Sequence, residues 1–146
     1  MYTLLDSGIL LRLSDRTDPQ FAAIDTAVSR IQIAGDVPGF TLQNAAEFWN
    51  TCTRPKTARG GLGLSLTETN RRLDVIERTF SLLADPPSLY AEWRQLVRTH
   101  GVMGKQVHDA RLVALMMTYG ITHILTLNGA DFARYPGIAV IDPNNP

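Results

Sequence analysis

The chain has 146 residues, of which 45% are hydrophobic and 19% are charged. This length can bury a hydrophobic core without disulfides or a structural metal, and we expect residues 1–146 to form a single domain. Lys and Arg total 14, as do Asp and Glu, so the zero net charge argues against a strongly basic nucleic-acid binder. Cys52 is the only cysteine, which excludes an intrachain disulfide and suits a reducing cytoplasm.

The first half of the chain predicts strands and helices in alternation. The apolar run at residues 2–5 is short, ends at Asp6 and has no basic stretch before it, so we expect neither a signal peptide nor a membrane span. Asp18 followed by Pro19 predicts the start of a helix, with Asp18 as its N-cap. In chain order, we expect a strand at 2–5, a helix from about 7, a helix from about 19 to Gly35, a weak strand at 37–41 and a helix at 43–53.

The second half continues this alternation. Residues 57–63 are rich in glycine and basic side chains and predict an exposed loop, whereas residues 107–119 are apolar on nearly every side and predict a buried helix that ends at Gly120. The remaining expected elements are a helix opened by Thr67 and Asn70 and running to about Thr79, a strand at 80–84, a helix from Ser88 to about His100, a strand at 121–126, a helical turn at 129–133 and a strand at 138–141. This alternation favours an α/β fold with a mostly parallel sheet, in which ligands bind outside the carboxyl ends of the strands.

Four acidic side chains stand out because their sequence neighbours are apolar. Asp6 follows YTLL, Glu47 lies within AAEFW, Asp109 opens the most apolar helix, and Asp131 precedes Phe132 after a predicted strand. A buried carboxylate is unfavourable unless it is paired or binds a cation. Mg²⁺ and Mn²⁺ prefer oxygen ligands, and the chain has no His or Cys cluster that would favour zinc. The pattern suggests a divalent-cation site of the kind that cleaves phosphodiester bonds, with one or two ions.

Each of these acids also has an ordinary structural interpretation. Asp6 and Asp109 could each cap a helix, because such residues accept hydrogen bonds from free backbone N–H groups at helix starts. Glu47 could form an ion pair with Arg54, and Asp131 could begin a turn. Spacing along the sequence does not establish that the four side chains converge.

Three segments of the chain, taken together in sequence order, form a recognisable pattern. They are LLDSGILLRL near the N-terminus, LQNAAEFWNTCTRP in the centre, and GKQVHDARLVALMMTYGITHILTLNGADFARY near the C-terminus. The last one combines a central Asp, a buried helix, a strand and an N-x-x-D-F turn. Together these segments resemble the PIN-domain family, in particular its VapC-like toxin branch. The resemblance runs through the whole chain, and residues 54–83 depart most from it because their loop is longer.

The resemblance implies a three-layer α/β fold, with a central, mostly parallel sheet of about four to five strands flanked by helices. It also implies a Mg²⁺- or Mn²⁺-dependent endoribonuclease that cuts single-stranded regions of RNA and leaves a 5′-phosphate and a 3′-hydroxyl. Carried over by position, the catalytic and metal-binding residues are Asp6, Glu47, Asp109 and Asp131. Ser7, Thr126 and Asn128 match supporting polar positions, and in some members the fourth acid lies where this chain has Asn128.

Several basic residues near these acids are candidates for contact with RNA phosphates. Lys105 precedes Asp109, and a solvated lysine at a helix start is the alternative interpretation. Arg54, Lys56 and Arg59 form a basic loop close in sequence to Glu47, for which a solvated loop is the alternative. Arg111 follows Asp109 and could also contact a phosphate.

The resemblance also bears on partners and on competing functions. It implies a homodimer and an antitoxin protein partner for a toxin, in addition to the RNA substrate. One alternative is a catalytically silent PIN-fold module that binds RNA or protein. Another is a carboxylate-metal enzyme of a different class, such as a phosphatase or a nuclease acting on DNA, since phosphate contacts carry no base identity.

Overall fold

Parallel strands form the centre of the fold in the computed structural model, which describes residues 1–146. The strands are β1 (Tyr2–Leu5), β2 (Val37–Thr41), β3 (Ser81–Leu83), β4 (His123–Leu125) and β5 (Ala139–Ile141). They lie in the order β3-β2-β1-β4-β5, and every neighbouring pair is parallel. The predicted α/β fold with a central parallel sheet is thereby confirmed.

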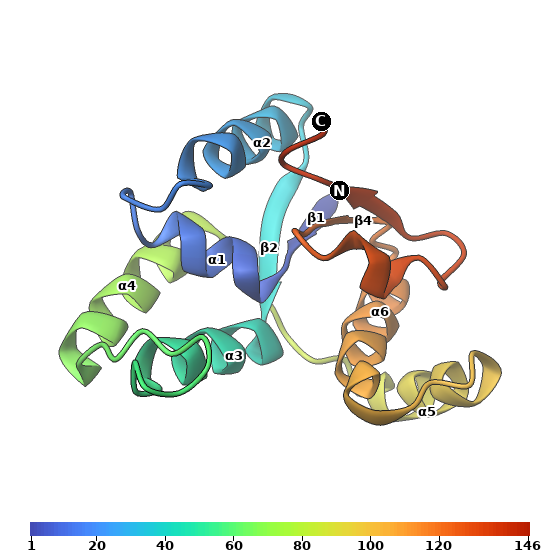
Figure 1. The fold of residues 1–146 in the computed structure, drawn as a ribbon. Helices are drawn as coiled ribbons and strands as arrows, with labels where there is room; N and C mark the ends of the chain where they lie inside the picture. Colours follow the sequence, from blue (N-terminus) through green and yellow to red (C-terminus); the bar gives the residue numbers. More distant parts are fainter.

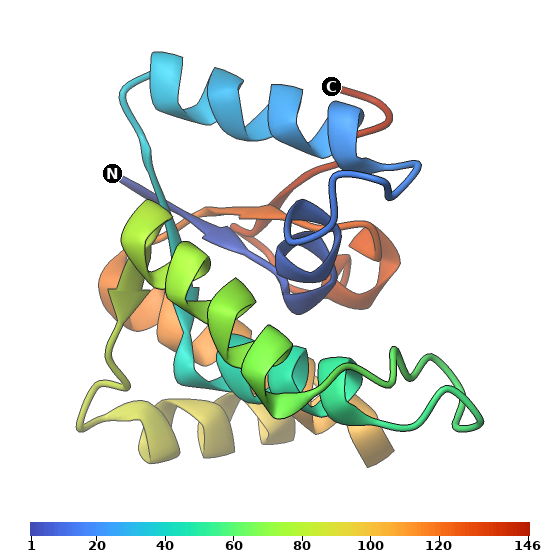
Figure 2. The same ribbon diagram turned by 90° about the vertical axis from the view of Figure 1, so that its left-hand side faces the viewer.

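Helices cover the sheet on both sides. They are α1 (Ser7–Leu13), α2 (Phe21–Ile33), α3 (Leu42–Thr53), α4 (Leu66–Thr79), α5 (Leu89–Thr99) and α6 (Val107–Tyr119), with short 3-10 turns η1 (Gly104–Gln106) and η2 (Gly129–Phe132). Figure 1 shows α1 to α4 on one side of the strands and α5 and α6 on the other. Figure 2, seen from the side of α4, shows α2 running along one end of the molecule and α5 along the opposite end. No helix is long and apolar enough to span a membrane.

Adjacent residues of the central strands supply two separate hydrophobic cores. Leu4 belongs to the core shared with α5 and α6, and Leu5 to the core shared with α1, α2 and α3. Ile124 and Leu125 in β4 divide in the same way. Successive side chains of a strand point to opposite faces, so a strand that is buried on both faces carries adjacent apolar residues, as Leu4–Leu5 and Ile124–Leu125 do.

The helix at residues 107–119 is buried as its composition predicts. Its middle carries the fully buried Val113 and Met116, and it ends at Gly120, whose φ of 70° is the left-handed conformation favoured by glycine at helix C-termini. Asp109 lies in the first turn of this helix.

Two predicted helix starts are wrong. Asp18 is not the N-cap of α2, because Gln20 occupies that position and the Asp18 carboxylate instead accepts hydrogen bonds from the Gln20 N–H and the Arg12 guanidinium. An extra turn at Asp18 therefore precedes the helix. Helix α4 starts at Leu66 with Ser65 as its N-cap, earlier than Thr67 predicts.

The direction of the chain across the sheet reverses between β1 and β4. From β1 the chain moves outwards to β2 and β3, and it then returns to the other side of β1 to form β4 and β5. Such a reversal leaves an opening at the carboxyl ends of the two central strands, where α/β proteins bind ligands. Asp6 directly follows β1, and Thr126 directly follows β4.

Candidate active site

Asp6 is fixed by hydrogen bonds from Thr126, which directly follows β4, and from the start of α1. Its Oδ2 accepts a hydrogen bond of 2.7 Å from the Thr126 hydroxyl, and its Oδ1 accepts one of 2.8 Å from the Ser7 N–H. Asp6 is therefore also the N-cap of α1, so the structural interpretation holds without excluding a functional one. Burial is the main reason why the pKa of Asp6 is raised; the hydrogen bonds oppose this rise, and the charges of Glu47 and Asp131 add to it.

Glu47 is held by one hydrogen bond on each carboxylate oxygen. The Ser7 hydroxyl donates to Oε2 at 2.5 Å, and Gln43 Nε2 donates to Oε1 at 3.0 Å. Glu47 makes no ion pair with Arg54, so that alternative is wrong. A carboxylate can accept about four hydrogen bonds, so lone pairs remain on both oxygens for a cation.

A buried polar network supports Ser7 from the start of α3. Asn44 Nδ2 donates to Ser7 Oγ at 3.3 Å, and the Asn44 carbonyl accepts hydrogen bonds from Thr41 in a capping box. The sequence interpretation missed Asn44 and Gln43. A signal was available for Asn44, because it precedes the buried Phe48 and Cys52 at four-residue steps and so lies on the buried face of the helix.

Among the four predicted acids, Asp109 has the carboxyl group whose pKa departs most from its usual value. It lies in the first turn of α6, but Gln106 is the N-cap, so Asp109 does not cap the helix. Its pKa is raised to about 6, first by burial and then by the negative charges of Asp131, Asp6 and Glu47, while His108 opposes the shift. The four acids are therefore close enough for their charges to interact.

Asp131 and Asn128 lie in the turn after β4. Asn128 is the N-cap of η2, and its N–H donates to Thr126 Oγ1 at 3.0 Å, while the exposed Asp131 lies in the first turn of η2. The backbone at Gly129 packs tightly on β5, where an added Cβ would lie 2.9 Å from the side chain of Val140. This packing positions the turn that carries Asp131.

No basic side chain neutralises the predicted acids. The ion pairs of the protein involve Asp36, Asp18, Glu68 and Asp85, and none includes the four predicted acids. The negative charge at the carboxyl edge of the sheet is thus not offset by any ion pair, and only His108 partly opposes it at Asp109. Such a charge favours a bound cation.

The donor set fits a hard divalent cation, although the side chains are not drawn together around one point. All four predicted ligands are carboxylates, which suit Mg²⁺ or Mn²⁺. No group of three or more His, Cys, Asp or Glu side chains is arranged to hold a metal ion. Without a cation, like charges repel, and Asp6 and Glu47 are held by hydrogen bonds to protein groups. A cation would have to draw the carboxylates towards itself.

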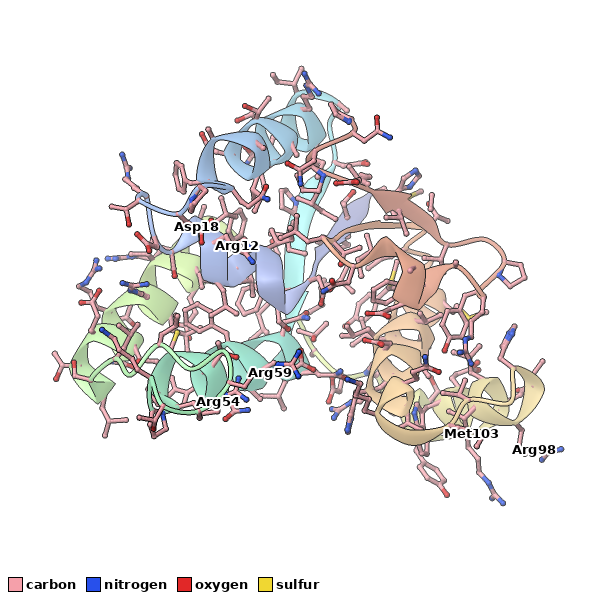
Figure 3. All side chains as sticks on the ribbon, in the orientation of Figure 1. Arg12, Asp18, Arg54, Arg59, Arg98 and Met103 are labelled. Carbon is pink, nitrogen blue, oxygen red and sulfur yellow. The ribbon has the colours of Figure 1, made fainter.

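The candidate phosphate-binding residues lie in different surroundings. Arg54, Lys56 and Lys105 are exposed or half-buried and make no ion pair, whereas Arg111 pairs with Asp85 at 2.8 Å. Figure 3 shows Arg54 and the neighbouring Arg59 beside α3. Arg111 is therefore engaged elsewhere, and Arg54 is held by a 3.5 Å hydrogen bond to Thr51 Oγ1 with its Nε buried. Lys56 and Lys105 are exposed and available to a ligand.

The arrangement of strands, helices and acids has counterparts among solved structures. A chain of the VapBC2 complex of Rickettsia felis, bound to a DNA fragment from its promoter, matches with a TM-score of 0.72 at 12% identity, covering 97% of this chain and 98% of that one. A chain of VapBC-1 from nontypeable Haemophilus influenzae matches with a TM-score of 0.71 at 17% identity, covering 99% and 100%. The protein has a VapC-like PIN-domain fold.

The VapC-like fold is shown by structure and not by sequence. No protein-family model matches the chain, and no curated protein matches it by sequence. VapC20 of Mycobacterium tuberculosis, a toxin that cleaves the sarcin-ricin loop, matches with a TM-score of 0.61 at 15% identity, covering 91% of this chain and 94% of that one. At such identities the likeness establishes the fold, and the activity of this chain has to be argued from its own residues.

Proposed function

We propose that this protein is a Mg²⁺- or Mn²⁺-dependent endoribonuclease that acts as the toxin of a toxin–antitoxin pair. The observation that carries the proposal is the uncompensated acid cluster of Asp6, Glu47, Asp109 and Asp131 at the carboxyl edge of the central strands. Burial first, and then the charges of the other three acids, raise the pKa of Asp109, and no Lys or Arg pairs with any of the four. A divalent cation both relieves that repulsion and serves phosphodiester cleavage.

Asp6, Glu47, Asp109 and Asp131 are the residues that would hold the cation. When bound, the cation would polarise the phosphate and activate a water. Thr126 and Ser7 would keep Asp6 in place, and Ser7 would also orient Glu47, through the hydrogen bonds that they already make. Asn128 would steady Thr126 through its backbone N–H.

RNA is the proposed substrate because a toxin of the same fold, VapC20, is a sarcin-ricin loop cleaving toxin. The basic loop with Arg54 and Lys56 offers cationic groups to the phosphate backbone without relying on base identity, as does Lys105. The formal net charge is zero, so this local patch would supply most of the electrostatic attraction.

An antitoxin is the proposed protein partner. The similar structures include the VapBC complexes and FitAB bound to DNA, in which a toxin-fold chain is found with its partner. The resemblance also leads us to propose a cytoplasmic homodimer. Apolar side chains that are available for such an interface include Leu82 and Tyr90, which are 61% and 68% exposed.

A catalytically silent module that binds RNA or protein is the second candidate. It is favoured by one observation, namely that the acids are not arranged around a common point. This candidate predicts RNA binding that a chelator does not affect, and no cleavage under any condition.

One experiment separates the two candidates. Purified protein is incubated with mixed RNA and with single-stranded DNA, in Mg²⁺, in Mn²⁺ and in excess chelator. We expect RNA to be cut only with metal, and Asp109→Asn to abolish cutting while circular dichroism shows an intact fold. Asp74→Asn, an exposed acid on α4, is the matched control and should cut normally. Cleavage that persists in chelator or in Asp109→Asn contradicts the proposed mechanism.

A further inference from the structure

Gln43 is a buried amide between two of the acid-bearing helices. It lies on α3 one turn before Glu47, and its side chain is only 8% exposed. Its Nε2 donates two hydrogen bonds, one of 3.0 Å to Glu47 Oε1 and one of 2.8 Å to the carbonyl of His108. Because His108 immediately precedes Asp109, one side chain touches both an acid and the backbone that carries another.

These hydrogen bonds connect the two layers of helices. Helix α3 packs in the core that includes Leu5, whereas α6 packs in the core that includes Leu4, on the opposite face of the sheet. Figure 1 shows α3 and α6 on either side of the sheet, and α3 begins directly after the carboxyl end of β2. The amide of Gln43 therefore bridges the layers at the edge where the acids lie.

The carbonyl oxygen of the Gln43 amide indicates that this side chain is placed to serve the candidate active site. Gln43 Oε1 is buried and accepts no hydrogen bond. Such buried acceptors are unusual in folded proteins and call for an explanation, because leaving one unpaired disfavours folding. Here the amide is oriented by its two donor contacts, and its own acceptor is left unpaired as a result.

We propose that Gln43 is a positioning residue that fixes Glu47 relative to Asp109, an inference that rests on the proposed metal-dependent function. Ser7 holds one oxygen of Glu47 and Gln43 holds the other, so together they fix the plane of the carboxylate. The second hydrogen bond ties the same amide to the start of α6. Without Gln43, Glu47 keeps only the hydrogen bond from Ser7, so the plane of its carboxylate is no longer fixed, and the start of α6 loses this link to α3.

The test measures cation binding directly. Mn²⁺ is titrated by calorimetry into the wild-type protein, Gln43→Met, and Gln32→Met as the control, since Gln32 is exposed on α2. Loss of groups that orient metal ligands typically weakens metal affinity about 10–100-fold. We expect a loss of that size for Gln43→Met and none for Gln32→Met, with the RNA cleavage rate at saturating Mn²⁺ also reduced.

A double-mutant cycle shows whether Gln43 acts through Glu47. Glu47→Gln alone should weaken Mn²⁺ binding, and adding Gln43→Met to it should weaken binding little further, because the group that Gln43 positions is already altered. Full additivity of the two losses contradicts the inference. Thermal unfolding of each variant is measured alongside, and Gln43→Asn, which keeps the amide but is too short to reach both partners, replaces Gln43→Met if the latter does not fold.

The outcomes separate this inference from the proposed function. If the wild-type protein binds no Mn²⁺ and cuts no RNA, the proposed function fails and the role of Gln43 fails with it. If the wild-type protein binds Mn²⁺ and both Gln43 variants bind it equally well, the proposed function stands and the role of Gln43 is overturned. A selective loss in the Gln43 variants supports both.

Discussion

The Thr126 hydroxyl donates a 2.7 Å hydrogen bond to Asp6 Oδ2 and so joins the ends of the two central strands. Thr126 is almost fully buried, at 1% exposed, and its oxygen also accepts from the Asn128 N–H. A single hydroxyl thus orients the first predicted acid and the turn that carries the fourth.

We predict that Thr126→Val weakens Mn²⁺ binding about 10-fold or more while the protein stays folded, because valine has the shape of threonine but cannot orient Asp6. The measurement is calorimetric titration together with the rate of RNA cleavage. Thr122→Val, in the exposed segment before β4, is the control and should change neither quantity. Unchanged Mn²⁺ affinity in Thr126→Val would show that this hydrogen bond does not serve the site.

We predict that Asp109→Asn stabilises the metal-free protein at pH 7.5 and not at pH 4. The pKa of Asp109 is raised from 3.8 to about 6 in the folded state. Below both values the group is neutral in both states, and as the pH rises through this range the unfolded state ionises first, so folding stability is lost. After allowance for partial exposure, the gain at pH 7.5 is about 1 kcal/mol, or roughly 2–4 °C in Tm.

The matched control for this effect is Asp74→Asn, whose Tm should follow that of the wild-type protein at both pH values. Mg²⁺ should raise the Tm of the wild-type protein at pH 7.5 and should leave the Tm of Asp109→Asn nearly unchanged, because the cation relieves the same repulsion. Equal Tm values for wild type and Asp109→Asn at pH 7.5 without metal would contradict the predicted repulsion.

Ser7→Ala should lower both stability and activity. The Ser7 hydroxyl donates to Glu47 and accepts from Asn44, so its loss leaves a buried amide without an acceptor. A buried donor without a partner destabilises by about 1–3 kcal/mol. Urea unfolding measures this change, with the exposed Ser29→Ala on α2 as a control that should lie within about 0.5 kcal/mol of wild type.

The basic loop should govern RNA affinity and not metal affinity. We predict that Lys56→Ala combined with Arg59→Ala weakens RNA binding and reduces the salt dependence of log K by about 1 to 2, since each phosphate contact contributes about 0.7–0.9. Fluorescence anisotropy with labelled RNA, over a range of salt, gives both quantities. Arg98→Ala is the control, because Figure 3 places Arg98 at the far end of α5. An equal loss in Arg98→Ala would mean that the loop has no special role.

The course of the chain could be predicted because its apolar runs are unambiguous. Leu4 and Leu5 in β1, like Ile124 and Leu125 in β4, are buried on both faces of the sheet, and helical segments flank both strands, which leaves few alternatives to parallel central strands. The apolar run stops abruptly at Asp6, and this change of polarity marks the carboxyl end of β1. The position of Asp6 at that edge of the sheet could therefore be predicted from local sequence alone.

The contacts around the acids could not be predicted because they depend on how the helices pack. A polar residue at a helix start, such as Gln43, usually faces solvent, and no neighbour in the sequence indicates that this side chain is buried. The separation of Arg111 from the site has a similar origin, since its partner Asp85 lies 26 residues earlier in the chain. Long-range pairs of this kind are set by the fold and leave no mark on local spacing.

The bond between Asp6 and Thr126 joins residues 120 positions apart in the chain. When the ribosome has made residues 1–120, three of the four predicted acids have been synthesised. Strand β4, which pairs with β1, has not. The cluster can therefore assemble only after β4 has been synthesised and has left the ribosome. Any chemistry that needs all four acids is therefore absent until nearly the whole chain has been made.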